Sequence, residues 1–193
     1  MNFTEKEFSI LSDRDFLLTK VEVINKVEQL LALTRKEIQE ALSNIDFHFS
    51  SEMNLSAGKI SKGENYRNLP YLVLDYPASF HKQNIFAYRT MFWWGNFFSS
   101  TLHLQGESLD LYRRRLIDTI DFLKDKGLFV SVGDTPWHYH YDANNYALIG
   151  KEHIEHLSTA TFIKLSKRME LVEWESVPQM ATENLKFLLN LLH

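Results

Sequence analysis

The sequence contains no cysteine, which excludes disulfide bonds, thiolate nucleophiles and thiolate metal ligands. Any soft metal ligand would therefore be one of the eight histidines. Proline and glycine are also scarce, with four and seven residues among 193. Neither residue occurs between residues 13 and 43, which allows a helical segment there.

Long apolar runs are missing as well, and no window approaches the roughly 18 uninterrupted apolar residues of a membrane span. The N-terminus, MNFTEKEFSILSDRD, carries acidic residues where a signal peptide needs a positive region followed by an apolar run. We therefore expect no membrane partner and a cytoplasmic location.

Neither sign of charge has a large excess. The chain has 25 acidic and 21 basic residues spread along its length, a formal net charge of −4 and a pI of about 6.1. Since nucleic-acid binding needs a basic surface that holds phosphates, this composition argues against a nucleic-acid partner.

What the chain does have is apolar and aromatic side chains, at 45% and 13% of residues. This content is enough to bury a core without metals or crosslinks. The length indicates a single globular domain over residues 1–193.

Residues 85–106 predict a β-hairpin at the centre of the sheet. Their sequence is IFAYRTMFWWGNFFSSTLHLQG. Glycine followed by asparagine between two aromatic runs favours a two-residue loop, Gly95 and Asn96, because glycine accepts a positive φ. That loop would place Trp94 opposite Phe97 and fix the register of every other pair along the two strands.

In this register one face of the hairpin mixes rings, hydroxyls and an imidazole, as the wall of a ligand pocket often does. We predict ligand contacts from Tyr88, Phe92, Trp94, Thr101 and His103. A histidine beside a tyrosine also suits general acid–base chemistry. The more common role of such a histidine is packing in a core or an interface.

Three helical segments are expected around the sheet. Residues 13–43 have helical apolar spacing without glycine or proline, which predicts either a helix that bends near Leu33-Thr34 and packs on the sheet or one helix that overhangs the domain. We favour the bent helix. An overhanging helix is a natural contact for a homodimer. Residues 108–126 predict a second helix, and a third opens at Ser176-Val177-Pro178.

The segment of about 44–68 loses the helical period and collects Ser, Asn, Gly and Lys, which indicates a long flexible loop. Apart from the helix expected at 108–126, the predicted strands follow one another without helices between them. This order is typical of the α+β class, with a largely antiparallel sheet and helices packed on it.

A metal site is the second hypothesis. His138, His140 and Asp142 alternate with tyrosines, so on a strand all three would point to one side, as ligands of a divalent metal such as Zn, Mn or Fe(II). The pattern resembles the opening metal motif of the metallo-β-lactamase superfamily. It departs from that motif at Ala143, where the next histidine would stand, so no function is carried over.

Arg89 stands on the otherwise apolar face of the hairpin, where a guanidinium requires a carboxylate. Asp75, on the preceding predicted strand, is the expected partner. Such a pair either captures a small anion or forms an internal ion pair, and we favour the second reading.

Three functions remain open from the sequence. The leading one is the binding of a small aromatic or apolar ligand against the hairpin. The alternatives are a metal-dependent enzyme built on residues 138–142 and a homodimeric interaction module that covers its aromatic surface.

Overall fold

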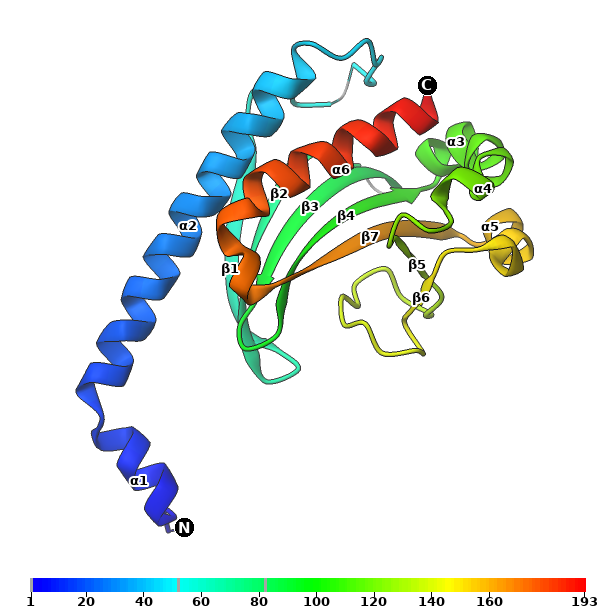
Figure 1. Ribbon diagram of the computed structural model, residues 1–193. Coiled ribbons are helices and arrows are strands. Elements are labelled where there is room, and N and C mark those ends of the chain that lie inside the picture. The colour runs from blue at the N-terminus through cyan, green and yellow to red at the C-terminus, as the bar shows by residue number, and fades with distance from the viewer. Residues whose placement is uncertain (1, 52, 82) are drawn as a thin grey trace.

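A computed structural model describes residues 2–51, 53–81 and 83–193. It contains helices and strands in the order shown in Figure 1: α1 (Glu5–Ser12), α2 (Arg14–Leu42), β1 (Lys59–Tyr66), β2 (Leu69–His81), β3 (Asn84–Trp93), β4 (Phe97–Gln105), α3 (Glu107–Asp118), α4 (Ile120–Leu123), β5 (Phe129–Ser131), β6 (Tyr146–Leu148), the 3₁₀ helix η1 (Lys151–His153), α5 (Ile154–Thr159), β7 (Phe162–Glu170), the 3₁₀ helix η2 (Leu171–Ser176) and α6 (Val177–Leu192).

Seven strands form one antiparallel sheet in the order β1-β2-β3-β4-β7-β5-β6. The first four strands are neighbours in the sequence and in space, so they form a meander. The chain then leaves through α3 and α4 and returns, and β7 enters between β4 and β5. The α+β class predicted from the sequence is confirmed.

The register of the central hairpin differs from the prediction by one residue. Trp93 pairs with Phe97, so the loop holds three residues instead of two. The amide of Asn96 bonds the carbonyl of Trp93 at 3.0 Å, and Gly95 has a φ of 70°. Glycine therefore takes the third position of a four-residue turn, where a type II turn requires positive φ.

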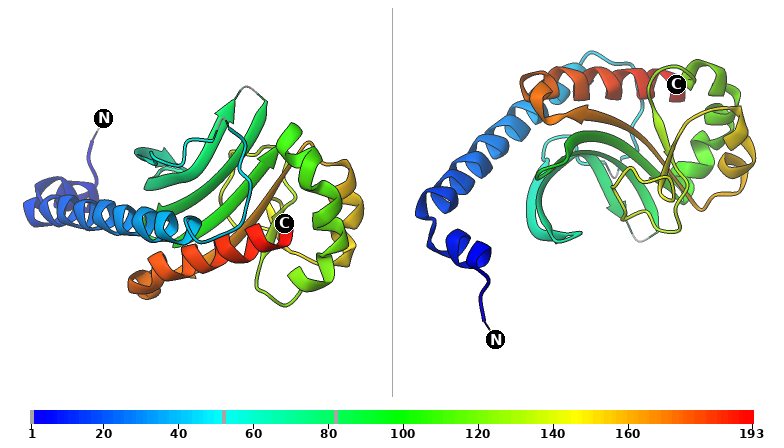
Figure 2. Two further views of the ribbon diagram at one scale, coloured as in Figure 1. Left: turned by 90° about the horizontal axis from the view of Figure 1, so that it is seen from above. Right: turned by 60° about the horizontal axis from the view of Figure 1, so that its bottom comes forward.

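Because of this shift, each β3 side chain shares its face with the β4 side chains that were predicted to lie on the other face. The first face carries Tyr88 and Phe92 and packs under α2 and α6, which lie side by side over it (Figure 2). The second face carries Arg89, Thr101 and His103, and residues 132–145 lie against it through Tyr139.

The N-terminal region is more helical than the sequence suggested. The first helical segment was expected to begin at residue 13, but α1 already occupies residues 5–12. α2 is one helix of 29 residues with no break at Leu33-Thr34. The hydroxyl of Thr34 donates to the carbonyl of Leu30 at 2.9 Å and so stays within the helix. The bent helix that we favoured is therefore wrong. The overhanging helix is the correct alternative, because α1 and the first half of α2 extend from the body (Figure 1).

Two other predicted elements differ. The segment 44–68 includes β1, whose half-exposed residues KISKGENY form the edge of the sheet. A solvated edge strand has little apolar alternation, so its sequence resembles a loop. The helix expected over 108–126 ends at Asp118, and α4 follows as a separate short helix. The last helix starts as predicted, with proline in its first turn.

None of the helices in the part of the chain that the structure describes has the length and apolar content needed to cross a membrane.

Candidate functional site

The five predicted ligand residues do not line a common surface. Tyr88, Phe92 and Trp94 belong to the face under the helices or to the loop that continues it, whereas Thr101 and His103 belong to the other face. The reason is the register, because Tyr88 pairs with Leu102 and not with His103. A pocket bounded by all five residues is therefore excluded by the geometry of the hairpin.

Tyr88 attaches α6 to the sheet. Its hydroxyl donates to the carbonyl of Ala181 at 2.7 Å and accepts from the side-chain amide of Asn184 at 3.2 Å. The side chain is fully buried, and this burial raises the pKa of Tyr88. These contacts occupy the hydroxyl and account for the polar atom inside the core.

On the other face, Arg89 and Asp75 form the predicted ion pair. Nε and Nη2 of Arg89 donate to the two carboxylate oxygens of Asp75 at 2.7 and 2.8 Å, and Nη1 donates to the hydroxyl of Tyr139 at 2.8 Å. Three of the five N–H groups of the guanidinium therefore donate to groups of the protein, one from each nitrogen. The arrangement agrees with the internal ion pair that we favoured over anion capture.

Lys164 is a second cation on this face, and no pattern in the sequence indicated it. Its side chain is fully buried, its ammonium donates to the carbonyl of His138, and it lies 4.4 and 4.9 Å from the ring centres of Tyr139 and Tyr146. Burial, together with the charge of Arg89, lowers the pKa of Lys164 to about 7. The lysine fixes residues 132–145 on the sheet through a carbonyl and two aromatic faces.

His103 pairs across the sheet with Lys164. Burial, helped by the positive charge of Lys164, lowers the pKa of His103 to about 3, so the imidazole is neutral at physiological pH. Its buried Nε2 has no hydrogen-bond partner within the described ranges. Thr101 lies beside it, with its hydroxyl 2.6 Å from that of Ser166.

The predicted metal ligands do not lie on a strand. The backbone amides of Tyr139 and His140 both donate to the hydroxyl of Tyr66, at 2.6 and 3.1 Å, instead of to a neighbouring strand. Alternation of polar and aromatic residues reflects packing of the tyrosines here, and no ladder is formed.

One of the three candidate ligands is bonded to another side chain. The carboxylate of Asp142 accepts from Arg67 at 2.7 Å, which lowers the pKa of Asp142. The rings of His138 and His140 are 5.2 Å apart. In the described residues no three His, Cys, Asp or Glu side chains form a group that could hold a metal ion.

An apolar groove lies at the turn of the central hairpin, and we call it the hairpin groove. It has a volume of about 460 Å³. Its walls come from α2, from the β3–β4 turn and from η2. The lining residues are Val23, Lys26, Val27, Leu30, Phe92, Trp94, Gly95, Phe98, Leu171 and Trp174.

Aromatic side chains form one side of the hairpin groove. Phe92 and Phe98 are cross-strand partners with ring centres 5.1 Å apart, and Trp94 meets Phe92 edge to face at 5.8 Å. Trp174 adds a fourth ring and is 51% exposed. Two of the predicted ligand residues, Phe92 and Trp94, therefore line a real hollow, although it lies at the end of the hairpin and not along its face.

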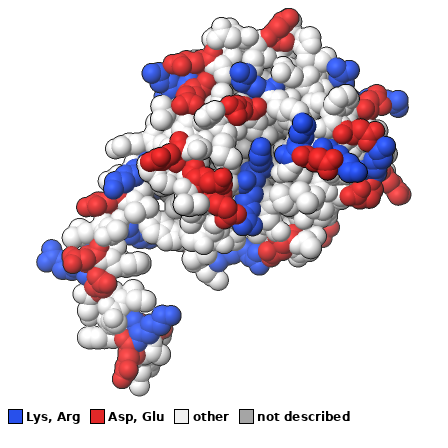
Figure 3. All heavy atoms as spheres, viewed as in Figure 1, with Lys and Arg blue, Asp and Glu red and all other residues white. Residues whose placement is uncertain are grey.

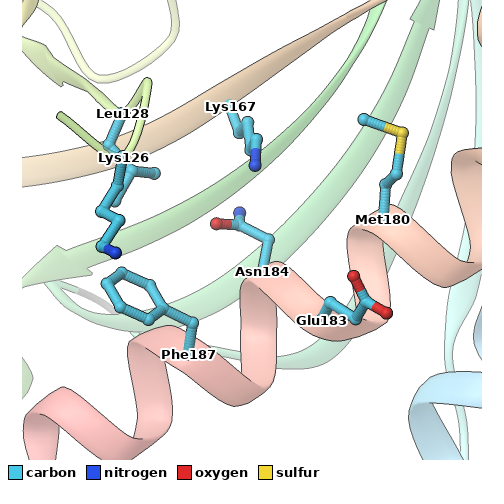
Figure 4. A pocket seen from close by; sticks show the side chains of 7 residues that line it. All are labelled: Lys126, Leu128, Lys167, Met180, Glu183, Asn184 and Phe187. Atoms are coloured by element: carbon cyan, nitrogen blue, oxygen red, sulfur yellow. The ribbon is translucent and has the colours of Figure 1, made fainter.

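A second hollow of about 230 Å³ lies between α6 and the sheet (Figure 4). Lys126 and Phe187 line one end, and Met180 and Glu183 line the other. The amide of Asn184 in its wall is bonded to the hydroxyls of Tyr88 and Ser100. This hollow is smaller than the roughly 300 Å³ at which ligand sites usually begin.

A third hollow of about 490 Å³ is as large as the hairpin groove but differs in its lining. It lies between residues 124–127 and 148–152 and is bordered by exposed charged side chains and by glycines. No aromatic side chain lines it. A further hollow, lined in part by Phe47, Phe86 and Tyr112, is also aromatic but has a volume of only about 190 Å³. The hairpin groove therefore differs from the other described hollows in combining an apolar lining with a volume above roughly 300 Å³.

Comparison with known proteins adds no further assignment, because no family model, curated protein or solved structure matches this chain.

Proposed function

We propose that the protein is a binding module and that the hairpin groove receives an apolar part of its ligand. The observation that carries this proposal is the set of four rings, from Phe92, Trp94, Phe98 and Trp174, around a hollow of about 460 Å³. Its volume lies within the roughly 300–1,000 Å³ of small-molecule and side-chain sites.

The chemistry of the groove favours apolar occupants. Burying roughly 100 Å² of apolar ligand surface there would contribute about 2.5 kcal/mol. Edge and face positions of the rings add specificity for another aromatic group. Lys26 is the one titratable side chain among the described residues of the lining.

The location of the other polar groups supports binding over catalysis. Arg89, His103 and Lys164 lie on the opposite face of the sheet, beneath residues 132–145. The two cations, Arg89 and Lys164, are bonded to groups of the protein itself. The metal-dependent enzyme of the sequence analysis has less support, because Asp142 is engaged by Arg67. We retain the cytoplasm as the proposed location.

Titration with the neutral apolar fluorophore N-phenyl-1-naphthylamine tests the proposal. We expect saturable binding with quenching of tryptophan fluorescence, and at least 10-fold weaker binding in Val23→Glu, which places a charge in the groove. Leu33→Glu is the matched control, since Leu33 is 47% exposed on the same helix outside the groove. Absence of saturable binding at every protein concentration, or full binding by Val23→Glu, would contradict the proposal.

A further inference from the structure

Apolar side chains are concentrated on the N-terminal arm, which we define as residues 2–22. Eight of the nineteen large hydrophobic residues that are exposed in the described chain lie there, although the arm is about a ninth of the sequence. They are Phe3, Phe8, Ile10, Leu11, Phe16, Leu17, Leu18 and Val21. The arm contributes no buried residue and projects from the body (Figure 1).

Helix α1 lacks the contacts that an eight-residue helix needs. Its N-terminus is well capped, because Thr4 accepts from the amide of Glu7 at 3.2 Å and the Glu7 carboxylate accepts from the amide of Thr4 at 2.7 Å. Capping alone does not stabilise so short a helix in water, where isolated helices below about 12 residues are marginal. None of its residues is buried in the structure as described, so α1 needs an apolar surface from elsewhere.

The spacing along the arm matches the arm to the hairpin groove of another copy. Phe8 in α1 precedes Leu17 by nine residues, and Lys26 in the groove follows Leu17 by nine. If two copies of α2 cross antiparallel with a two-fold axis at Leu17, Lys26 of each copy lies about 14 Å from the axis. The same number of residues separates Leu17 from Phe8, which gives α1 of the other copy the reach to this position. Asp13, which is extended between α1 and α2, sets the direction that α1 takes.

The charges fit the same arrangement. Lys26 lines the groove and has no ion pair among the residues described, while Glu5 lies in the first turn of α1. The arm carries five acidic and three basic side chains, which gives a net charge of −2. Figure 3 shows both signs mixed with uncharged atoms along the arm. Net negative charge disfavours an anionic lipid surface as the partner.

The available area is sufficient for a stable dimer. Eight side chains that are each about half to two-thirds exposed present roughly 600 Å² of apolar surface, and the groove adds to this on the other copy. Two arms and two grooves together reach the roughly 1,200–2,000 Å² of a specific interface.

We propose that the hairpin groove binds α1 of a second copy of this chain, so that a two-fold dimer contains two reciprocal contacts between arm and groove. This inference rests on the proposed function, because it names the occupant of the same groove. The dimer covers the exposed side chains of the arm and supplies the packing that α1 lacks.

Sedimentation velocity over a range of concentrations measures the dimer. We expect a dimer for the wild-type chain and at least about 100-fold weaker association for Phe8→Glu and for Val23→Glu, since a buried charge disrupts an interface centre. Phe122→Glu and Leu33→Glu are the matched controls, at exposed sites on α4 and α2. Circular dichroism of each variant confirms that the body is folded. A monomeric wild type overturns the proposal.

Mixing the two defective variants is the more specific test. A heterodimer of Phe8→Glu with Val23→Glu keeps one intact contact, between the arm of the second variant and the groove of the first. Neither homodimer keeps any. We therefore expect the mixture to associate more tightly than either variant alone. No gain on mixing would overturn the reciprocal contact, as would association of the arm with zwitterionic vesicles while the protein stays monomeric.

The fluorophore separates failure of this inference from failure of the proposed function. If both hold, its affinity for the wild-type chain falls as protein concentration rises, because the arm competes, and Phe8→Glu binds it independently of concentration. A monomeric wild type that binds the fluorophore through Val23 overturns the dimer alone. A folded Phe8→Glu variant that never binds it overturns the apolar groove itself.

Discussion

Asp75 and Arg89 face each other directly across β2 and β3, and both carboxylate oxygens accept from the guanidinium, at 2.7 and 2.8 Å. The two side chains are only 11% and 17% exposed. Tyr139 adds a third contact and connects the pair to residues 132–145. This cluster therefore holds the covering segment on the sheet.

Removing one member of this pair leaves the other charge without its partner in a largely buried place. We predict that Asp75→Leu or Arg89→Met lowers the free energy of unfolding by about 3 kcal/mol. The double variant should lose less than the two single losses combined, since both charges are then removed. Urea unfolding of the four proteins measures this cycle. Additive losses would show that the two side chains are not coupled.

The ion pair could be predicted because it depends on the alternation of faces along two adjacent strands. A cation among apolar residues needs an acid, and Asp75 was at the right place. The hairpin register could not be fixed in the same way. A Gly-Asn pair is compatible with a two-residue loop and also with a turn that places Gly95 third and leaves three residues in the loop. The registers of the two hairpins differ by one residue.

His103 makes the stability of the fold depend on pH in the acidic range. Burial and the nearby charge of Lys164 lower its pKa to about 3, against an ordinary value of 6.5. Between these values the unfolded chain binds a proton that the folded chain does not, so stability falls as the pH falls. We predict that the wild type loses about 3 kcal/mol more than His103→Gln between pH 6.5 and 4.

Thermal and urea unfolding at both pH values provide this comparison. Carboxylates elsewhere titrate in both proteins, so the difference between the two curves reports the histidine. Parallel curves would mean that the imidazole is protonated as readily in the folded chain as in the unfolded one.

Lys164 makes the stability of the fold depend on pH in the alkaline range. Its pKa falls from 10.5 to about 7 because the ammonium is buried and faces Arg89. Between pH 7 and 10.5 the unfolded chain therefore binds more protons, and stability rises with pH. We predict that the wild type gains about 2 kcal/mol relative to Lys164→Met between pH 7 and 9. An equal response of both proteins in urea unfolding would contradict the lowered pKa.

Only some residues of the candidate site could be predicted from patterns in the sequence. Phe92 and Trp94 were identified because aromatic runs beside a turn are visible in the sequence, but Trp174 lies 80 residues further on and joins them only through η2. Lys164 was missed because it lies in an alternating strand where a lysine normally faces solvent. Its signal was the position opposite His103, which only the β4–β7 register reveals.

The four tryptophans offer the most direct measurement of the central claim, that the hairpin groove is the binding surface. Trp94 and Trp174 line the groove, whereas Trp93 and Trp137 contact the opposite face of the sheet. Addition of N-phenyl-1-naphthylamine to dilute ¹⁵N-labelled protein should therefore shift the indole N–H signals of Trp94 and Trp174 and leave the other two in place. Shifts confined to Trp93 and Trp137, or none at saturation, would contradict the account.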